Sequence, residues 1–195
     1  MVRNFQDRPV PLDVIESLVD LARRAPSAGN SQGWDLVVLR DSDTARFWDI
    51  TLPAERRESF RWQGLLTAPV IALPYADRGA YLARYAEPDK VRTGLAVADA
   101  WPVPYWLVDT GFFTMTFLLA AQHAGLGALF FGVFQEEAAL NTALAVPPDR
   151  QLLGAIALGY PAPSESGRSA KRPKRTVTDI VHDGGWVSNR EHGDA

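Results

Sequence analysis

The chain has 195 residues, of which 47% are hydrophobic and 22% charged, which is the composition of a folded globular protein rather than a disordered one. Its formal net charge of -3 gives no support to nucleic-acid binding, and the absence of cysteine excludes disulfides and thiolate chemistry. The three histidines lie far apart in the sequence, without the spacing of metal ligands. The N-terminus lacks the apolar segment of a signal peptide, so we expect a cytoplasmic protein.

The first part of the chain predicts a helix followed by two buried strands. Residues 9–25 have a charged side and one apolar helical face, formed by Leu12, Ile15, Leu18, Val19 and Ala22. The run "DLVVL" (35–39) is typical of a short buried strand, and "APVIALPYA" (68–76) of a second one. Between them "SDTARFWDI" (42–50) predicts a short helix.

The segment 77–104 is the least regular part of the sequence and predicts a helix or loop excursion over a pocket. Three large aromatic residues lie at or just beyond its end, namely Trp101, Tyr105 and Trp106. They are either lid aromatics that stack on a flat substrate or anchors of a surface loop. The sequence alone leaves both readings open.

A long apolar helix is expected after Pro104, ending near Gly125. It is apolar nearly all round, which predicts a central, buried helix. The uncharged run 110–135 has the length of a bilayer span, but Gln122 and His123 lie in its middle and a glycine pair divides it. A helix followed by a strand therefore explains it better.

The rest of the chain predicts a strand at 128–134, a helix at 136–144 and a strand at 152–160. Strands alternate with helices, so we expect a mixed sheet covered by helices on both faces. After Tyr160 the composition becomes rich in proline and serine and then basic, which is typical of an extended arm. We therefore expect one domain over 1–162, with an arm over 163–195 that belongs to it.

Three features of the sequence fit a flat ligand with an anionic tail. A loop near residue 30 offers hydroxyl and amide groups, a strand carries Gly132, and the run 171–175 is basic. Amides and hydroxyls bond the heteroatom edge of a ring, a glycine lets backbone N–H groups approach it, and cations neutralise a phosphate. This profile fits flavin mononucleotide (FMN). Taken alone, the loop could equally be a turn with local backbone bonds, and the basic run a solvated tail.

Three motifs, "ARRAPSAGNSQGW", "LLAAQHAGLGALFFGVF" and "AIALGYPAP", occur in this order. Together they resemble the FMN-dependent nitroreductase family, and the first resembles its A-P-S-x-x-N-x-Q-P-W signature. The resemblance extends from about Val2 to His182. It implies an α+β fold, a three-layer α/β/α sandwich whose central sheet is mixed but largely antiparallel, with the C-terminal arm exchanged in a homodimer. It also implies FMN at the dimer interface and transfer of hydride from NADH or NADPH through flavin N5 to a nitroaromatic, quinone or related acceptor.

The resemblance assigns cofactor contacts to individual residues. Arg3 matches a basic residue on the flavin phosphate or ring edge, and Asp109 a polar position that meets the cofactor from the partner subunit. Phe131 and Gly132 match the strand whose backbone faces the ring. The loop that the second subunit contributes matches Pro26, Ser27, Ala28 and Asn30, and the closing basic group on the phosphate matches Arg172, Lys174 and Arg175. No side chain is expected to act as a catalytic acid or base, because the flavin carries the chemistry.

The sequence departs from the family pattern at several positions. An Arg-Ser type phosphate motif is missing before Val2, so either the true start lies upstream or the cluster 171–175 carries more of the phosphate charge. Gly33 replaces a proline and Ala28 a serine. Arg61 and Gln63 are the nearest substitutes for the residues that contact the pyrimidine edge of the ring in some members.

Three functions remain open at this stage. The first is the NAD(P)H-dependent oxidoreductase described above. The second is specialised flavin chemistry on the same fold, such as dehalogenation, flavin fragmentation or dehydrogenation of a biosynthetic intermediate. The third is a non-catalytic protein that binds or sequesters flavin.

Overall fold

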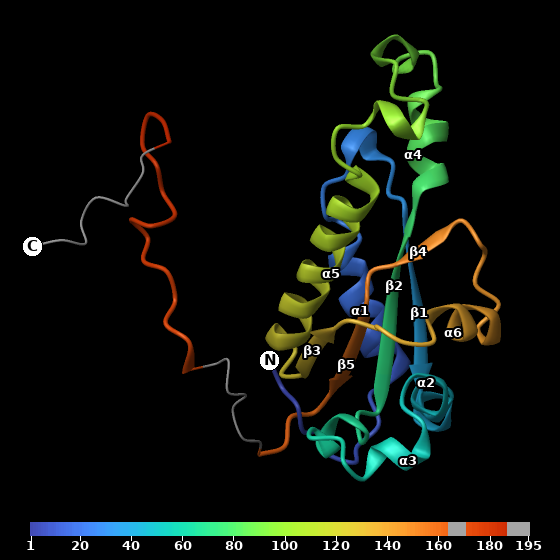
Figure 1. The fold of residues 1–195 in the computed structure, drawn as a ribbon, viewed down its shortest axis with the longest axis vertical. Coiled ribbons are helices and arrows are strands. Elements are labelled where there is room, and N and C mark those ends of the chain that lie inside the picture. The colour runs from blue at the N-terminus through green and yellow to red at the C-terminus, as the bar shows by residue number, and fades with distance from the viewer. Residues whose placement is uncertain (164–170, 187–195) are drawn as a thin grey trace, which may run out of the picture. The chain divides into compact units, whose positions relative to one another are not determined.

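The computed structural model describes residues 1–163 and 171–186, which fall into two compact units, 1–164 and 165–195. In the first unit, helices cover both faces of a sheet (Figure 1). Its helices are α1 (Leu12–Ala22), α2 (Thr44–Thr51), α3 (Ala54–Arg57), α4 (Arg78–Tyr85), α5 (Tyr105–His123) and α6 (Glu137–Ala143). Its strands are β1 (Trp34–Arg40), β2 (Val70–Asp77), β3 (Gly127–Phe131), β4 (Arg150–Leu152) and β5 (Ala155–Gly159).

The sheet has the order β1-β2-β5-β3, with β4 also paired to β2. All its ladders among the described residues are antiparallel. We expected a mixed, largely antiparallel sheet, and these residues form no parallel pair. Strand β2 lies at the centre, and only its last residue, Asp77, is not fully buried. The predicted α+β class, with a sheet between helical layers, is confirmed.

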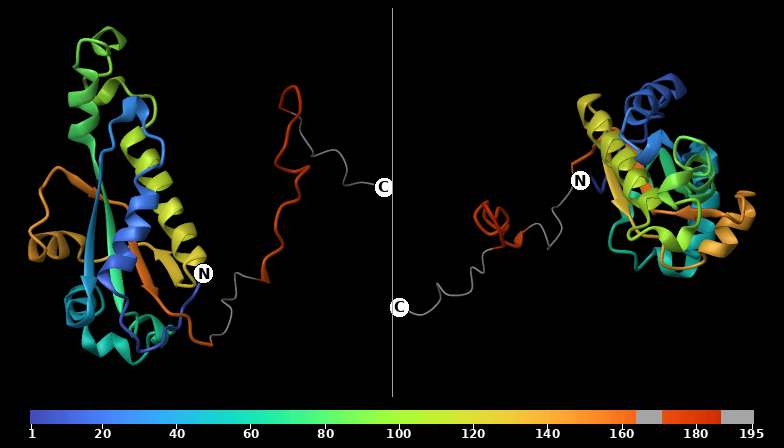
Figure 2. Two further views of the ribbon diagram at one scale, coloured as in Figure 1. Left: turned by 180° about the vertical axis from the view of Figure 1, so that it is seen from behind. Right: turned by 90° about the horizontal axis from the view of Figure 1, so that it is seen from above.

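Side-chain alternation on the central strands divides the core into two layers. Val70 and Ala72 of β2 face a cluster with α1 and α5, whereas Ile71, Leu73 and Tyr75 face a cluster with α2 and α6. Figure 2 shows α1 and α5 packed side by side along the sheet. Of the apolar face predicted for 9–25, α1 buries Ile15, Leu18 and Ala22, whereas Leu12 at its start is 47% exposed.

Helix α5 is less buried than its composition suggests. Phe113 and Phe117 pack against the sheet, but Phe112, Met115 and Leu119 are 47%, 52% and 54% exposed. The expectation of a helix buried all round is therefore wrong for the chain taken alone, because the described residues of the first unit leave one apolar side of α5 exposed. No helix in the described part of the chain is both long and apolar enough to cross a membrane.

Two strand boundaries differ from the prediction. The third strand ends at Phe131, so Gly132 follows β3 instead of lying within it. The run 152–160 is divided between β4 and β5, which pair with different parts of β2. The register along β2 shifts by one residue between the two strands, where Gly154 adopts a positive φ of 152°.

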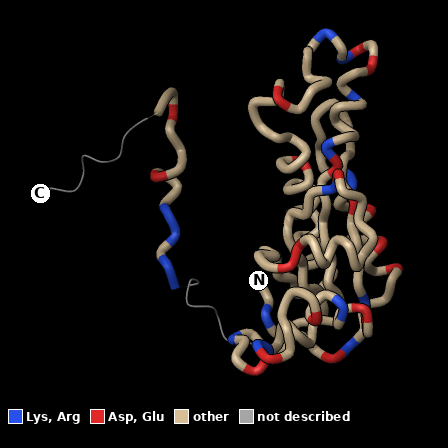
Figure 3. Tube along the Cα trace, turned by 45° about the vertical axis from the view of Figure 1, so that its right-hand side comes forward, with Lys and Arg blue, Asp and Glu red and all other residues tan. Residues whose placement is uncertain are grey.

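The second unit forms no helix or strand over residues 171–186. It contains a turn in which Asp179 Oδ2 accepts hydrogen bonds from the Thr176 N–H and Oγ1, at 2.8 and 2.7 Å. These bonds lower the pKa of the Asp179 carboxyl. Figure 3 shows the basic residues of 171–175 close together in this unit.

Candidate functional site

The loop with the predicted cofactor contacts contains the turn η1 (Ala28–Asn30). Ser27 Oγ accepts the Gln32 N–H at 3.0 Å, and Ser31 Oγ donates to the Ala28 carbonyl at 2.7 Å. Asn30 Oδ1 accepts from Gln32 Nε2 at 3.1 Å. The local turn bonds that the sequence allowed as an alternative are thus present. The Asn30 side chain is nevertheless exposed, and its own N–H groups donate to no acceptor within residues 1–163.

Asp109 of α5 binds this loop through a hydrogen bond to its side chain. Its Oδ2 accepts the Ala28 N–H at 2.8 Å and the Tyr81 hydroxyl at 2.8 Å, and its side chain is 2% exposed. Burial and the neighbouring carboxylate both raise the pKa of the Tyr81 phenol, so Tyr81 remains a donor. Asp109 therefore positions the loop of its own chain; that it also meets a cofactor stays a prediction.

Helix α4 holds the other side of the loop. Arg84 Nε donates to the Gly29 carbonyl at 2.9 Å, while the same guanidinium pairs with Asp89 at 2.8 Å. The ring of Tyr85 lies against Gly29, closely enough that a Cβ there would come within 2.9 Å of it. The irregular segment 77–104 thus contributes, through Arg84 and Tyr85, the contacts that hold Gly29 of this loop.

The position of the Tyr81 ring explains why residue 33 is a glycine, where the family signature has a proline. A Cβ at Gly33 would lie 2.6 Å from the Tyr81 ring and 2.7 Å from the Asp77 carbonyl oxygen, well inside van der Waals contact. The space of a side chain at position 33 is therefore occupied by the tyrosine that bonds Asp109. The aromatic residues Trp101 and Trp106 are 9% and 8% exposed and pack with Tyr81, which favours the anchor reading over the lid.

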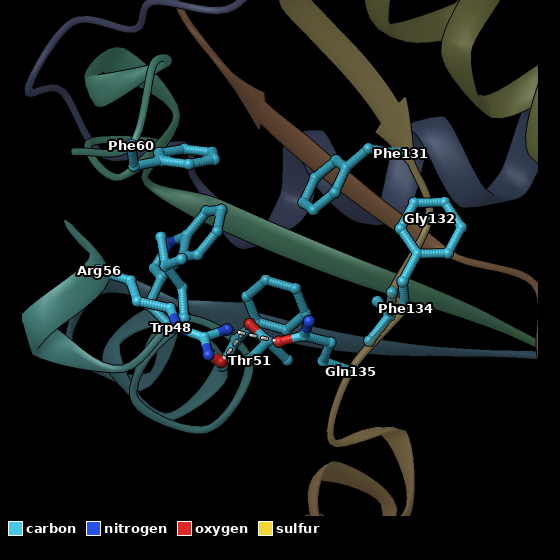
Figure 4. A pocket seen from close by; sticks show the side chains of 11 residues that line it. Trp48, Thr51, Arg56, Phe60, Phe131, Gly132, Phe134 and Gln135 are labelled. Carbon is cyan, nitrogen blue, oxygen red and sulfur yellow. Dashed lines mark hydrogen bonds between the residues drawn. The ribbon is translucent and has the colours of Figure 1, made fainter.

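A pocket of about 310 Å³ lies at the end of β3 (Figure 4). Phe131 forms one wall, stacked on Trp48 with ring centroids 6.0 Å apart, and Phe60 lies across from it. Gly132 belongs to the same wall, and the ring of Phe134 lies against it, where a Cβ would come within 2.4 Å. Phe131 thus faces the pocket, while Phe130 points to the opposite side of the strand, as alternation predicts.

One edge of this pocket is polar. Arg56 Nη1 donates to Gln135 Oε1 at 3.0 Å, and Thr51 lies beside this pair (Figure 4). Arg56 forms no ion pair within residues 1–163. The ion pairs of this range are formed by other arginines, namely Arg23, Arg24, Arg57, Arg84 and Arg150. Arg56 therefore brings a positive charge to a pocket that is otherwise lined mainly by apolar residues.

Arg3 and Arg61 share the ring of Trp62, with guanidinium carbons 4.8 and 4.6 Å from its centroid. Two cations held on one aromatic ring form a local positive patch. Gln63, in contrast, donates to the carbonyls of its own turn, among them that of Phe60 at 2.8 Å. Its amide nitrogen is thus engaged by the chain. That Arg61 or Gln63 contacts the pyrimidine edge of a flavin stays a prediction.

The predicted site residues form separate groups in one chain. The loop belongs to the aromatic cluster of Tyr81 and Trp101, whereas Phe131 belongs to the cluster of α2 and α6. The loop is bonded near the start of α5, and β3 begins after the end of that helix (Figure 1). Arg172, Lys174 and Arg175 belong to the second unit, where Arg175 donates to the Asp179 carbonyl; their phosphate contact stays a prediction.

Three residues that shape the loop and the pocket edge were not predicted from the sequence: Tyr81, Arg84 and Arg56. Each acts through a partner far away in the sequence: Tyr81 through Asp109, Arg84 through Gly29 and Arg56 through Gln135. No spacing rule connects such pairs. The only signal was the excess of aromatic residues in the irregular segment that contains Tyr81.

Known proteins with a similar sequence were found over most of the chain. A Thermus thermophilus NADH dehydrogenase is 28% identical over 176 residues, covering 83% of this chain and 82% of the relative. A Nocardioides 4-nitrobenzoate reductase is 30% identical, covering 82% of this chain and 76% of its own. An iodotyrosine deiodinase from Nematostella vectensis is 29% identical, covering 83% of this chain and 63% of the relative.

Solved structures show the same fold. A Desulfovibrio desulfuricans protein crystallised in complex with FMN superposes with a TM-score of 0.65 at 24% identity, covering 95% of this chain and 92% of that one. The model of the Nitroreductase family matches residues 1–160, which carry the loop, the tyrosine–aspartate pair and the pocket. This chain belongs to the Nitroreductase family.

Proposed function

We propose that the protein is an FMN-dependent oxidoreductase. It takes hydride from NADH or NADPH and passes it to a nitroaromatic, quinone or related acceptor in a ping-pong cycle. The observation that carries this proposal is the wall of the β3 pocket, where a residue without a side chain, Gly132, stands beside aromatic rings and a cationic group. Family membership and the names of the similar oxidoreductases support it.

The residues present fit FMN. Gly132 has no side chain at the pocket wall, and a flat ring could approach its backbone once the Phe134 ring, which lies against Gly132, turned aside. The exposed amide of Asn30 can bond polar atoms of the ring, and the guanidiniums of Arg3 and Arg61 suit its electron-rich edge or its phosphate. Lys174 and its neighbours add positive charge for the phosphate. Bound FMN would supply the hydride chemistry, while the chain binds and orients it and keeps water from the ring.

We also propose that the protein is a homodimer, with the flavin at the interface and the arm over 163–195 exchanged between subunits. The exposed apolar side of α5 continues into a groove of about 490 Å³ lined by Met1, Met115, Leu119 and Phe130. A contiguous apolar surface of this kind is typical of a buried interface, and a two-fold axis can pair it with itself. In one chain the loop at 26–30 and the pocket at the end of β3 belong to separate clusters. A second copy would bring its own loop to that pocket.

The specific reaction has an alternative within the family. Relatives include the iodotyrosine deiodinase and a Rhodospirillum rubrum protein named 5,6-dimethylbenzimidazole synthase, 26% identical over 98% of this chain and 86% of its own. A dedicated enzyme of that kind should turn over nitrofurazone and menadione poorly with either nicotinamide. A non-catalytic flavin carrier would bind FMN that neither NADH nor NADPH reduces.

The deciding experiment is the visible absorbance of the purified protein, alone and after mixing with FMN, followed by anaerobic addition of NADH or NADPH. We expect a yellow protein whose flavin bleaches with a nicotinamide and is reoxidised by menadione. A protein that remains colourless after mixing with FMN and desalting would overturn the proposal.

A further inference from the structure

We propose that Arg84 is a positioning residue for the flavin: through the Gly29 carbonyl it fixes the direction in which Asn30 presents its side-chain amide. That this amide contacts a flavin rests on the proposed function. The hold of Arg84 on the loop rests only on contacts within one chain, so the two can be tested apart.

The peptide group between Gly29 and Asn30 is held at both of its polar atoms. Its carbonyl oxygen accepts the Arg84 Nε–H at 2.9 Å, and its N–H, which belongs to Asn30, donates to the Ser27 carbonyl at 2.9 Å. Because a peptide group is planar, these two bonds fix its orientation. The direction in which the exposed Asn30 side chain leaves the backbone follows from that orientation.

The backbone of this loop is one that needs support from outside. Gly29, Asn30 and Gln32 are all left-handed, with φ of 61°, 56° and 50°. Glycine adopts this conformation freely and asparagine more readily than most residues, but it is unfavourable for glutamine. Such conformations persist where the surrounding structure over-determines them. Without Arg84, we therefore expect the Gly29 peptide to turn and the Asn30 amide to lose its fixed direction.

Asp89 determines which N–H group of Arg84 is available for the loop. Its two carboxylate oxygens accept Nη1 and Nη2, each at 2.8 Å, in the bidentate geometry that a guanidinium favours. This contact fixes the plane of the guanidinium and leaves Nε–H for the Gly29 carbonyl. A lysine carries a single flexible ammonium group, which cannot reproduce this three-nitrogen arrangement.

The charge of Arg84 is already balanced within its own segment. Asp89 takes both terminal nitrogens, and Glu87 accepts a further bond from Nη1 at 3.2 Å. The bond from Arg84 lowers the pKa of the Asp89 carboxyl, which keeps the pair charged at neutral pH. Arg84 therefore acts on a ligand through the loop and not through its own charge.

The first measurement needs no flavin. Hydrogen exchange at the Asn30 N–H, followed by NMR, reports whether this group stays bonded to Ser27. Arg84→Ala and the conservative Arg84→Lys should each raise its exchange rate about tenfold, which corresponds to about 1.4 kcal/mol, while the amides of β2 keep their wild-type rates. An unchanged rate at Asn30, or an equal rise in β2, would overturn the hold on the loop.

Arg92→Gln is the matched control for this measurement. It removes the same charge from the same segment, at an exposed residue of the turn η4 (Val91–Thr93). The Asn30 exchange rate should remain that of the wild type in this variant. A rise as large as in Arg84→Ala would mean that loss of charge, and not loss of the Gly29 bond, loosens the loop.

The second measurement asks whether Arg84 acts on FMN through Asn30. Arg84→Ala should weaken FMN binding about five- to tenfold in the wild-type chain, but less than about twofold when combined with Asn30→Gly. Glycine keeps the left-handed backbone and removes only the amide. Equal weakening in both backgrounds would overturn the route through Asn30, and full recovery of binding in Arg84→Lys would mean that charge alone matters.

The two proposals fail separately. FMN binding that is the same in the wild type and in Arg84→Ala would defeat this inference alone. A wild-type protein that binds no FMN, with Asn30 exchange that depends on Arg84, would defeat the proposed function and support the hold of Arg84 on the loop.

Discussion

Tyr81 and Asp109 form a buried hydrogen-bonded pair, 2.8 Å between the phenol oxygen and Oδ2, with side chains 0% and 2% exposed. Because Asp109 also accepts the Ala28 N–H, the pair connects the segment 77–104, helix α5 and the loop at residue 28. A carboxylate buried this deeply needs its donors. The geometry of the loop therefore depends on the Tyr81 hydroxyl, which donates to the carboxylate that accepts the Ala28 N–H.

Tyr81→Phe should destabilise the protein by about 1–3 kcal/mol, because it leaves the Asp109 carboxylate with one donor fewer in a dry site. The loosened loop should also retain less FMN. Thermal denaturation and FMN titration measure the two effects. Tyr105→Phe is the matched control, since Tyr105 is 40% exposed; a similar loss in both variants would show that the Asp109 bond is not the cause.

The stability of the protein should fall in strong alkali through Tyr75. Burial, with the charge of Glu137, raises the pKa of Tyr75 from 10.0 to about 12. Its folded pKa lies above the unfolded one, so this contribution is complete below pH 10 and is lost as the pH rises from 10 to 12. The loss from this group should reach about 2 kcal/mol at the upper end. Urea unfolding at several pH values should show a shallower decline in Tyr75→Phe; parallel pH profiles would contradict the assignment.

Gly33→Ala should destabilise the protein by about 1–3 kcal/mol, because the new methyl group would overlap the Tyr81 ring and the Asp77 carbonyl. Gly111→Ala is the control: it lies within α5 with open space around its Cβ, and should be neutral or stabilising by up to about 1 kcal/mol. Denaturant midpoints compare the two variants. If Gly33→Ala proved as stable as Gly111→Ala, the close packing at residue 33 would be refuted.

Leu119→Lys should convert the proposed dimer to monomers and lower FMN retention, because it places a charge in the apolar side of α5. Light scattering after size exclusion measures the mass, and absorbance measures the flavin. Leu21→Lys makes the same change on α1, where the leucine is 47% exposed, and should affect neither. A wild-type monomer that binds FMN normally would rule out the interface.

FMN binding should weaken in two variants for different physical reasons. One variant is Asn30→Ala, and the other is the double change Lys174→Ala with Arg175→Ala. The Asn30 amide bonds polar atoms, so its loss should weaken FMN and riboflavin alike, by about three- to tenfold. The cationic pair acts on the phosphate, so its loss should affect FMN alone and should disappear at high salt, where the charges are screened. Equal loss for riboflavin in the double variant would place these cations away from the phosphate.

Much of the fold could be predicted because its patterns are local. The apolar face of α1 repeats every three or four residues, and the runs of β1 and β2 are apolar and short, so neighbouring residues are enough to assign them. The uncharged run after Asp109 was correctly divided into a helix and a strand because its glycines lie at the helix end. The loop at 26–30 was recognised from its own motif.

What the sequence by itself determined is therefore most of the elements, the loop motif and the resemblance to the family. Only the tertiary structure decided which side chains act together: Ala28 meets Asp109 across 81 positions of sequence, and Arg56 meets Gln135 across 79. It also decided that one side of α5 is exposed, which composition alone could not show. The physical reason is that helix and strand patterns are set by neighbours along the chain, whereas a buried pair or a pocket edge depends on how distant segments pack.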